Sequence, residues 1–88
     1  MIRTVVYGTG RMGAAVVEAA RHSDHVSIVA TVGPERPEWK SAIPWHPSLD
    51  ELPDTPELLI DFTLPEGTRK AVGWCADHRV ALYKVVKQ

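Results

Sequence analysis

The chain has 88 residues, which corresponds to one small domain able to bury only about 60–65% of its unfolded surface. Its 10 Lys and Arg residues nearly balance its 11 Asp and Glu residues, and no block of like charge occurs, so neither nucleic acid nor an anionic membrane is expected as the main partner. No apolar run reaches the roughly 20 residues of a membrane span, and the single Cys75 excludes an internal disulfide, so we expect a cytoplasmic protein.

The N-terminal third of the sequence predicts a β-α-β unit. Ile2–Tyr7 contains a β-branched run typical of a buried strand. Arg11–His22 has helical periodicity, and Val26–Val32 is a second β-branched strand. The apolar side chains that this periodicity turns toward the sheet are Met12, Ala15, Val16, Ala19 and Ala20.

Three glycines between the first strand and the first helix have the spacing G-x-G-x-x-G, which is typical of dinucleotide-binding turns. Gly8 would permit the tight turn, Gly10 would let the backbone approach a pyrophosphate, and Gly13 would let the helix pack close to the strand. Backbone N–H groups at the start of the helix would then face an anion. The spacing and its context favour dinucleotide binding over a turn that only packs a helix on a sheet.

The stretch from Gly33 to Pro56 contains six of the seven prolines, so it is predicted to be a surface excursion and not a regular helix. Within it, Ser48 and Glu51 have the spacing of a capping box around one short helical turn. Trp39 and Trp45 would either cover an adenine ring or a partner surface, or pin the excursion to the edge of the sheet. We favour the second interpretation.

The remaining elements complete a Rossmann-like, doubly wound α/β domain with a mostly parallel sheet. Glu57–Thr63 is a third strand whose carboxyl end is polar, and Asp61 there is expected to accept hydrogen bonds and not to act as a general base. A helix over Glu66–His78 and a last strand over Val80–Val86 follow. The helix is expected to turn inward Ala71, Val72, Cys75 and Ala76, with Cys75 as a small buried residue.

Two segments together resemble one family. Gly8-Thr9-Gly10-Arg11-Met12-Gly13 and Ile60-Asp61-Phe62-Thr63-Leu64-Pro65-Glu66-Gly67-Thr68 are similar to the cofactor-binding domain of bacterial dihydrodipicolinate reductase, the NAD(P)H enzyme of lysine and diaminopimelate synthesis. The resemblance implies that Gly8, Thr9, Gly10, Arg11, Met12 and Gly13 hold the pyrophosphate of NADPH or NADH. It also implies that Phe62 and Thr63 lie against the nicotinamide-ribose side.

The sequence departs from the family pattern in three places. The glycine turn is one residue shorter than in many members. After the second strand, Glu35 would accept from a ribose hydroxyl or Arg36 would pair with a phosphate, and the choice between NADH and NADPH stays open. The sequence ends at Gln88, before the family's G-T-T-G turn and substrate domain. Residues 1–88 are therefore expected to be a truncated cofactor-binding domain without catalytic residues or metal ligands, unable to catalyse alone.

Two further expectations concern partners. A second class of function stays open, in which the chain is a stand-alone nucleotide- or coenzyme A-binding or interaction module without enzymatic activity. The strand Val80–Val86 is predicted to lie at an edge of the sheet and is mostly apolar. An unprotected apolar edge is a template for pairing, so we expect a homodimer formed through this C-terminal strand.

Overall fold

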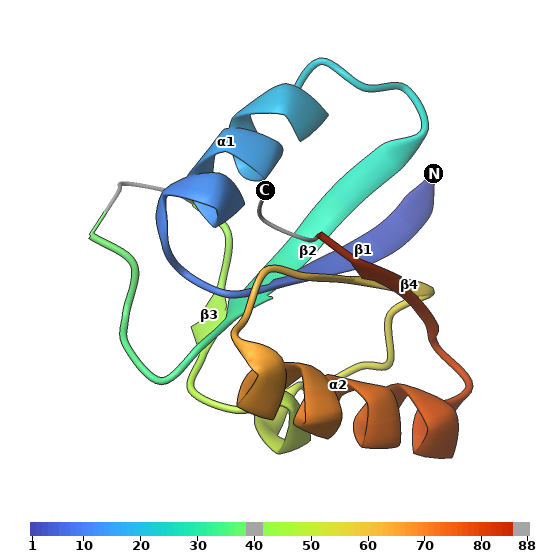
Figure 1. The fold of residues 1–88 in the computed structure, drawn as a ribbon. Coiled ribbons are helices and arrows are strands. Elements are labelled where there is room, and N and C mark those ends of the chain that lie inside the picture. Colours follow the sequence, from blue (N-terminus) through green and yellow to red (C-terminus); the bar gives the residue numbers. More distant parts are fainter. Residues whose placement is uncertain (39–41, 86–88) are drawn as a thin grey trace.

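The computed structural model describes residues 1–38 and 42–85. Within these ranges the strands form one five-stranded sheet in the order β3-β2-β1-β4-β5 (Figure 1), and every neighbouring pair is parallel. This confirms the predicted Rossmann-like α/β class. Trp39 and Val86, which carried two of the expectations above, lie outside the described residues. The strands are β1 (Ile2–Tyr7), β2 (Val26–Val32), β3 (Trp45–His46), β4 (Leu58–Asp61) and β5 (Ala81–Lys84).

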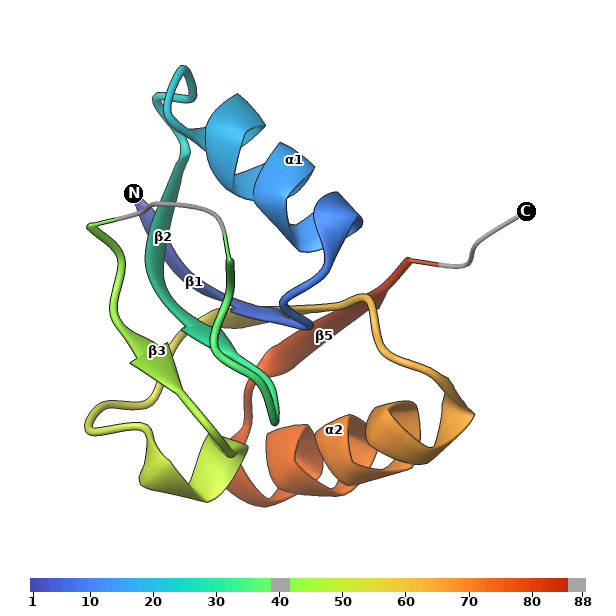
Figure 2. The same ribbon diagram turned by 90° about the vertical axis from the view of Figure 1, so that its left-hand side faces the viewer.

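Helices cover both faces of the sheet (Figure 2). The helix α1 (Arg11–Ala20) lies on one face, whereas α2 (Pro65–His78) and the short 3₁₀ helix η1 (Leu49–Glu51) lie on the other. Because β1 is the central strand, its side chains are covered on both faces, and both Val5 and Val6 are fully buried. Across the described residues, no helix is long and apolar enough to cross a membrane.

The main core lies between the sheet and α2. Burial raises the pKa of the Cys75 thiol in this core, and the nearby charge of Asp61 raises it further, so Cys75 is a buried, unreactive packing residue as predicted. The core residues are Val5, Tyr7, Ala30, Val32, Leu49, Leu59, Ala71, Cys75 and Val80.

The predicted inward face of α1 is only partly right, since Val16 and Ala20 are half-buried. Gly13 and Val17 are the buried residues of this helix, whereas Met12, Ala15 and Ala19 are exposed. The buried stripe is therefore rotated from the predicted one and centred on Gly13 and Val17, because the close approach of Gly13 to the glycine turn fixes the rotation of the helix about its axis. The helix also ends at Ala20, two residues earlier than His22.

For α2 the prediction is half right. Ala71 and Cys75 are buried, but Val72 and Ala76 are exposed. The half-buried Trp74 takes the place on the inward face that was expected of the smaller apolar residues. The helix begins at Pro65, and its C-terminal end is formed by Arg79 in the left-handed conformation (φ 58°).

The excursion after β2 contains one strand that the sequence did not predict. Trp45 and His46 form β3, which pairs with Thr31 and Val32 at the end of β2. The expected short helical turn is present as η1, with Ser48 as its N-cap. The Ser48 side chain makes no hydrogen bond to the backbone of the turn, and its hydroxyl lies 3.4 Å from a carboxylate oxygen of Glu51.

Candidate functional site

Glycines fix the turn between β1 and α1. Gly8 has a φ of +125°, a conformation that favours glycine. Its N–H group donates to the Val32 carbonyl oxygen (2.8 Å) and so joins the carboxyl ends of β1 and β2. A Cβ atom on Gly13 would lie 2.6 Å from the Gly8 carbonyl oxygen, so the first turn of α1 packs directly on the glycine turn. These contacts confirm the structural roles predicted for Gly8 and Gly13.

The N-terminus of α1 is open to an anion. Its N-cap is Gly10, which has no side chain to cap the helix. Ala14 contributes the first N–H group bonded within the helix, to the Gly10 carbonyl oxygen (3.1 Å). The preceding N–H groups and the positive end of the helix dipole are therefore available to a ligand. A Cβ atom on Gly10 would meet no atom within 4 Å, so the ligand can approach the backbone closely.

A cavity of about 620 Å³ adjoins this N-terminus. Two positive side chains, those of Arg11 and Arg36, and two negative ones, those of Glu35 and Glu38, line this cavity. The Thr9 hydroxyl donates to the Glu35 carbonyl oxygen (3.0 Å), which ties the loop after β2 to the glycine turn. The lining residues are Thr9, Gly10, Arg11, Ala14, Glu35, Arg36 and Glu38.

The indole of Trp45 anchors the loop that carries Arg36. Its Nε1–H group donates to the Gly33 carbonyl oxygen (3.0 Å), and the Arg36 guanidinium carbon lies 5.7 Å from the centroid of the Trp45 ring, within cation–π range. Trp45 thus pins the excursion to the sheet edge, which confirms the favoured interpretation for this tryptophan.

At the carboxyl end of β4, Asp61 is a fully buried hydrogen-bond acceptor. Its Oδ1 atom accepts from the Thr63 backbone N–H group (2.8 Å) and from the Thr63 hydroxyl (2.5 Å). Its Oδ2 atom accepts from the Thr68 hydroxyl in the first turn of α2 (2.6 Å). The carboxylate therefore holds together the end of β4, the following turn and the start of α2, and the predicted acceptor role is confirmed.

The environment of Asp61 favours its charged form. Burial of the carboxyl group is the largest single influence and raises the pKa of Asp61, whereas hydrogen bonds from Thr63 and Thr68 lower it. The positive charge of Lys84 acts in the same direction, so the pKa lies below its ordinary range. At neutral pH Asp61 is thus a stable anion, unsuited to accept a proton in a reaction.

Sequence reasoning missed the role of Lys84, which it treated only as a charge within the last strand. The register of β4 and β5 places Asp61 opposite Lys84, with the ammonium nitrogen 3.6 Å from the Asp61 Oδ2 atom. The ammonium also donates to the Thr63 carbonyl oxygen. The sequence did contain a signal for this ion pair, because Asp61 and Lys84 carry opposite charges near the carboxyl ends of two predicted strands.

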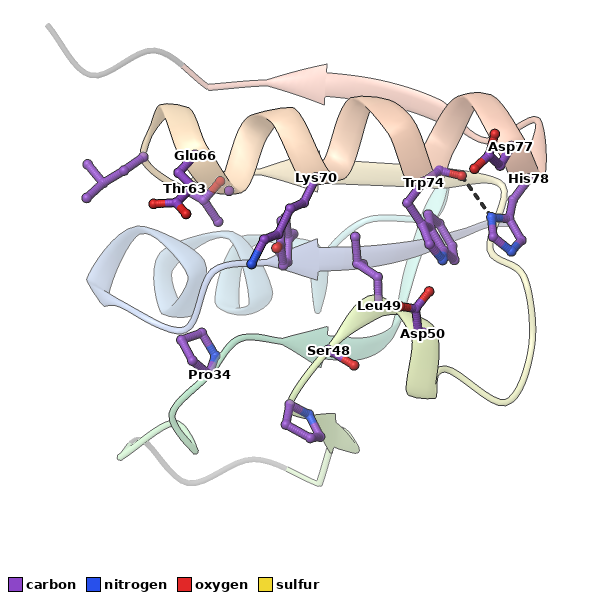
Figure 3. Close-up of a pocket in the computed structure, with 14 residues that line it drawn as sticks. Pro34, Ser48, Leu49, Asp50, Thr63, Glu66, Lys70, Trp74, Asp77 and His78 are labelled. Carbon is purple, nitrogen blue, oxygen red and sulfur yellow. Dashed lines mark hydrogen bonds between the residues drawn. The ribbon is translucent and has the colours of Figure 1, made fainter.

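A second cavity, of about 820 Å³, runs between α2 and η1 (Figure 3). Thr63 and Leu64 line one end, at the carboxyl edge of the sheet. At the other end the Trp74 and His78 rings stack with centroids 4.4 Å apart, and the Nδ1 atom of His78 lies 2.8 Å from the Trp74 carbonyl oxygen.

The predicted cofactor residues gather along the carboxyl edge but divide between the two cavities. Thr9, Gly10, Arg11 and Arg36 line the first cavity, and Thr63 lines the second. Phe62 lies beside the glycine turn, since a Cβ atom on Gly8 would be 3.2 Å from the Phe62 Cβ atom. Met12 is 41% exposed on the outer side of α1 and, like Phe62, lines neither cavity.

Comparisons with known proteins agree with this arrangement. Residues 2–83 match the family described as dihydrodipicolinate reductase, N-terminus. The chain is 33% identical to the 4-hydroxy-tetrahydrodipicolinate reductase of Stenotrophomonas maltophilia, over 92% of this chain and 36% of that protein.

A solved structure has the same fold. Dipicolinate-bound dihydrodipicolinate reductase from Paenisporosarcina superimposes with a TM-score of 0.86 at 20% identity, covering 99% of this chain and 38% of that one. The chain therefore spans little more than a third of the length of these relatives. Since the family match extends over nearly all of its residues, the chain belongs to the N-terminal domain family of dihydrodipicolinate reductase, the nucleotide-binding part of an NAD(P)H-dependent enzyme.

Proposed function

We propose that this domain binds NADH or NADPH across the carboxyl edge of its sheet. The observation that carries the proposal is the open N-terminus of α1 beside a cavity that contains Arg11 and Arg36. The pyrophosphate would be held by the backbone of Gly8–Gly13. The nicotinamide-ribose side would lie toward Phe62 and Thr63, at the end of the neighbouring strand.

Arg36 and Glu35 are the residues proposed to choose between the two cofactors. Both line the cavity beside the glycine turn. A 2′-phosphate would pair with the Arg36 guanidinium, whereas the carboxylate of Glu35 would accept a hydrogen bond from an unmodified ribose hydroxyl. Trp45 supports the loop that carries them, so the pair is held at the adenosine end of the site.

Reduction is proposed to require the part of the reductases that lies outside the match. Hydride transfer needs the acceptor held in near-attack geometry against the nicotinamide, and the cofactor supplies the hydride. The chain matches 36% of the reductase from Stenotrophomonas maltophilia. We therefore propose that the 88 residues hold the cofactor for lysine and diaminopimelate synthesis in the cytoplasm but do not turn over substrate by themselves.

Isothermal titration with NADH, NADPH and coenzyme A tests the binding proposal. Either nicotinamide cofactor should bind with a measurable constant, and coenzyme A should not. Binding of coenzyme A alone, or of none of the three, would overturn the proposal. A parallel assay with 4-hydroxy-tetrahydrodipicolinate, the substrate in the relative's name, should show no oxidation of NADPH or NADH, and measurable turnover would contradict the second part.

We further propose that the domain self-associates through β5. In the described part of the chain, β5 pairs with β4 and with no other strand. Leu82 packs against the core, so Tyr83 points to the opposite face by strand alternation, where it is 62% exposed. A small domain gains from burying such a surface, and a two-fold symmetric pairing of two β5 edges would do so.

A further inference from the structure

Lys84 occupies an unusual position for a lysine at the end of an edge strand. Its side chain is 31% exposed, against 0% for that of Asp61. The ammonium group turns inward, 3.6 Å from the Asp61 Oδ2 atom, and donates to the carbonyl oxygen of Thr63. A solvated lysine would extend its charge away from the sheet, so these contacts indicate a specific role for the ammonium.

Together, Asp61 and Lys84 bind every polar group of Thr63. Asp61 accepts from the backbone N–H group and from the hydroxyl, and Lys84 donates to the carbonyl oxygen. The orientation of Thr63 is therefore fixed from both sides by one ion pair. Removal of the ammonium would leave the buried carboxylate without its cation and the Thr63 carbonyl without its donor.

We propose that Lys84 is a positioning residue for the nicotinamide end of the cofactor site, acting through Thr63. The inference rests on the proposed function, in which Thr63 lies on the nicotinamide-ribose side. The adenosine end depends on other contacts, those of the glycine turn with the loop after β2. Lys84 thus affects binding of the nicotinamide half and leaves binding of the adenosine diphosphate half unchanged.

The test compares NADH with ADP, which has the adenosine and pyrophosphate but lacks the nicotinamide and its ribose. Lys84→Met should weaken NADH binding by about tenfold, the scale of one lost charged hydrogen bond, while ADP affinity changes less than about twofold. Lys84→Arg keeps a cation and a donor, and it should restore most of the NADH affinity. Titration of both ligands gives the ratio directly.

Arg3→Met is the matched control. Arg3 forms an ion pair with Glu57 (3.5 Å) at the amino end of the sheet, far from the cofactor edge, so its removal should leave the NADH-to-ADP ratio unchanged. If Lys84→Met does not fold, Lys84→Gln replaces it and should give the same selective loss.

Two results would overturn the inference: unchanged NADH affinity in folded Lys84→Met or Lys84→Gln, or an equal loss for NADH and ADP in these variants. Failure of the proposed function itself is distinguishable, since the unmodified chain would then bind neither NADH nor NADPH, whether or not it binds ADP.

Discussion

Asp61 gains its stability as a buried anion mainly from hydroxyl and backbone donors. Because the pKa of Asp61 is lowered in the folded state, its ionisation stabilises the fold at pH values above the unfolded-state pKa, about 4. That contribution is lost as the pH falls through the folded-state pKa. Acid unfolding of the domain should therefore include protonation of this carboxylate.

Thr68→Val should make the domain more sensitive to acid. The substitution removes the hydroxyl that donates to Asp61, and we expect a loss of about 1–3 kcal/mol at neutral pH, the cost of an unsatisfied buried acceptor. The midpoint of acid unfolding should move to higher pH. Circular dichroism in a pH titration, with urea unfolding at pH 7, measures both.

Thr31→Val is the control for this prediction. Thr31 is also buried, but its hydroxyl has no hydrogen-bond partner among the described residues, so the same isosteric change should be neutral or stabilising and should leave the acid midpoint unchanged. Identical acid midpoints for the two variants would show that the Thr68 hydroxyl does not stabilise the carboxylate.

Gly10→Val should weaken cofactor binding without unfolding the domain. A Cβ atom at Gly10 meets no atom within 4 Å, so the fold tolerates it, but the side chain would stand between the backbone of the turn and the pyrophosphate. We expect NADH affinity to fall by at least about 1–3 kcal/mol, measured by titration. Gly73→Val, at an equally open position on α2, should leave affinity unchanged. Equal affinity in both variants would place the nucleotide elsewhere.

Arg36→Ala should change the preference between the two cofactors. If the guanidinium pairs with the 2′-phosphate, NADPH binding should weaken by about tenfold, on the scale of a charged hydrogen bond, and NADH binding should change little. Arg69→Ala, on the exposed side of α2, is the control. An equal loss for both cofactors would indicate that Arg36 contacts the pyrophosphate they share.

At the scale of elements, the sequence predicts the type of each long segment better than its orientation. The β-branched runs of β1 and β2 predict the first and last residues of both strands correctly, because no helical periodicity competes with them there. The inward faces of the helices are less predictable. In α1 the phase follows from the contact of Gly13 with the Gly8 carbonyl, and alanine-rich sequence leaves the hydrophobic stripe too broad to reveal it.

The candidate site could likewise be predicted from the sequence only in part. The glycine spacing predicts the turn, because Gly8 has a positive φ and Gly13 packs directly on the Gly8 carbonyl group. The Asp61–Lys84 ion pair depends on the register of two strands that are joined through a helix, and β3 is only two residues long. Neither a long-range register nor so short a strand leaves a periodic signal in the sequence.

Val17→Ala should destabilise the domain more than Val72→Ala. Val17 is 4% exposed on the inward side of α1, whereas Val72 is 52% exposed on α2. Removing two buried methyl groups should cost about 1–3 kcal/mol, between the usual costs of Ile→Val and Leu→Ala, and the exposed change should cost less than about 0.5 kcal/mol. Urea unfolding measures both. Similar losses would contradict the observed rotation of α1.

At the scale of the whole molecule, the open edge of β5 predicts self-association. Tyr83→Glu places a charge on the exposed face of β5 and should shift a dimer to monomer in light scattering. Val85→Pro is less suitable, because the Val85 N–H group donates to the Asp61 carbonyl oxygen (2.9 Å) within the sheet. Val72→Glu, equally on the surface but on α2, should leave the dimer intact. A parent chain that is monomeric at high micromolar concentration would refute the prediction.

The central position of β1 also constrains the order in which this domain can fold. Its partners β2 and β4 both follow it in the sequence, and the Arg3–Glu57 contact that secures the β4 side spans 54 residues. During synthesis one edge of β1 therefore keeps its backbone N–H and C=O groups unpaired until β4 has left the ribosome. The entropy lost on closing this long loop must be overcome before β1 and β4 can pair, which makes folding slow relative to a domain with mostly local contacts. Until then the unpaired edge of β1 is exposed to aggregation, and a chaperone would act on it there.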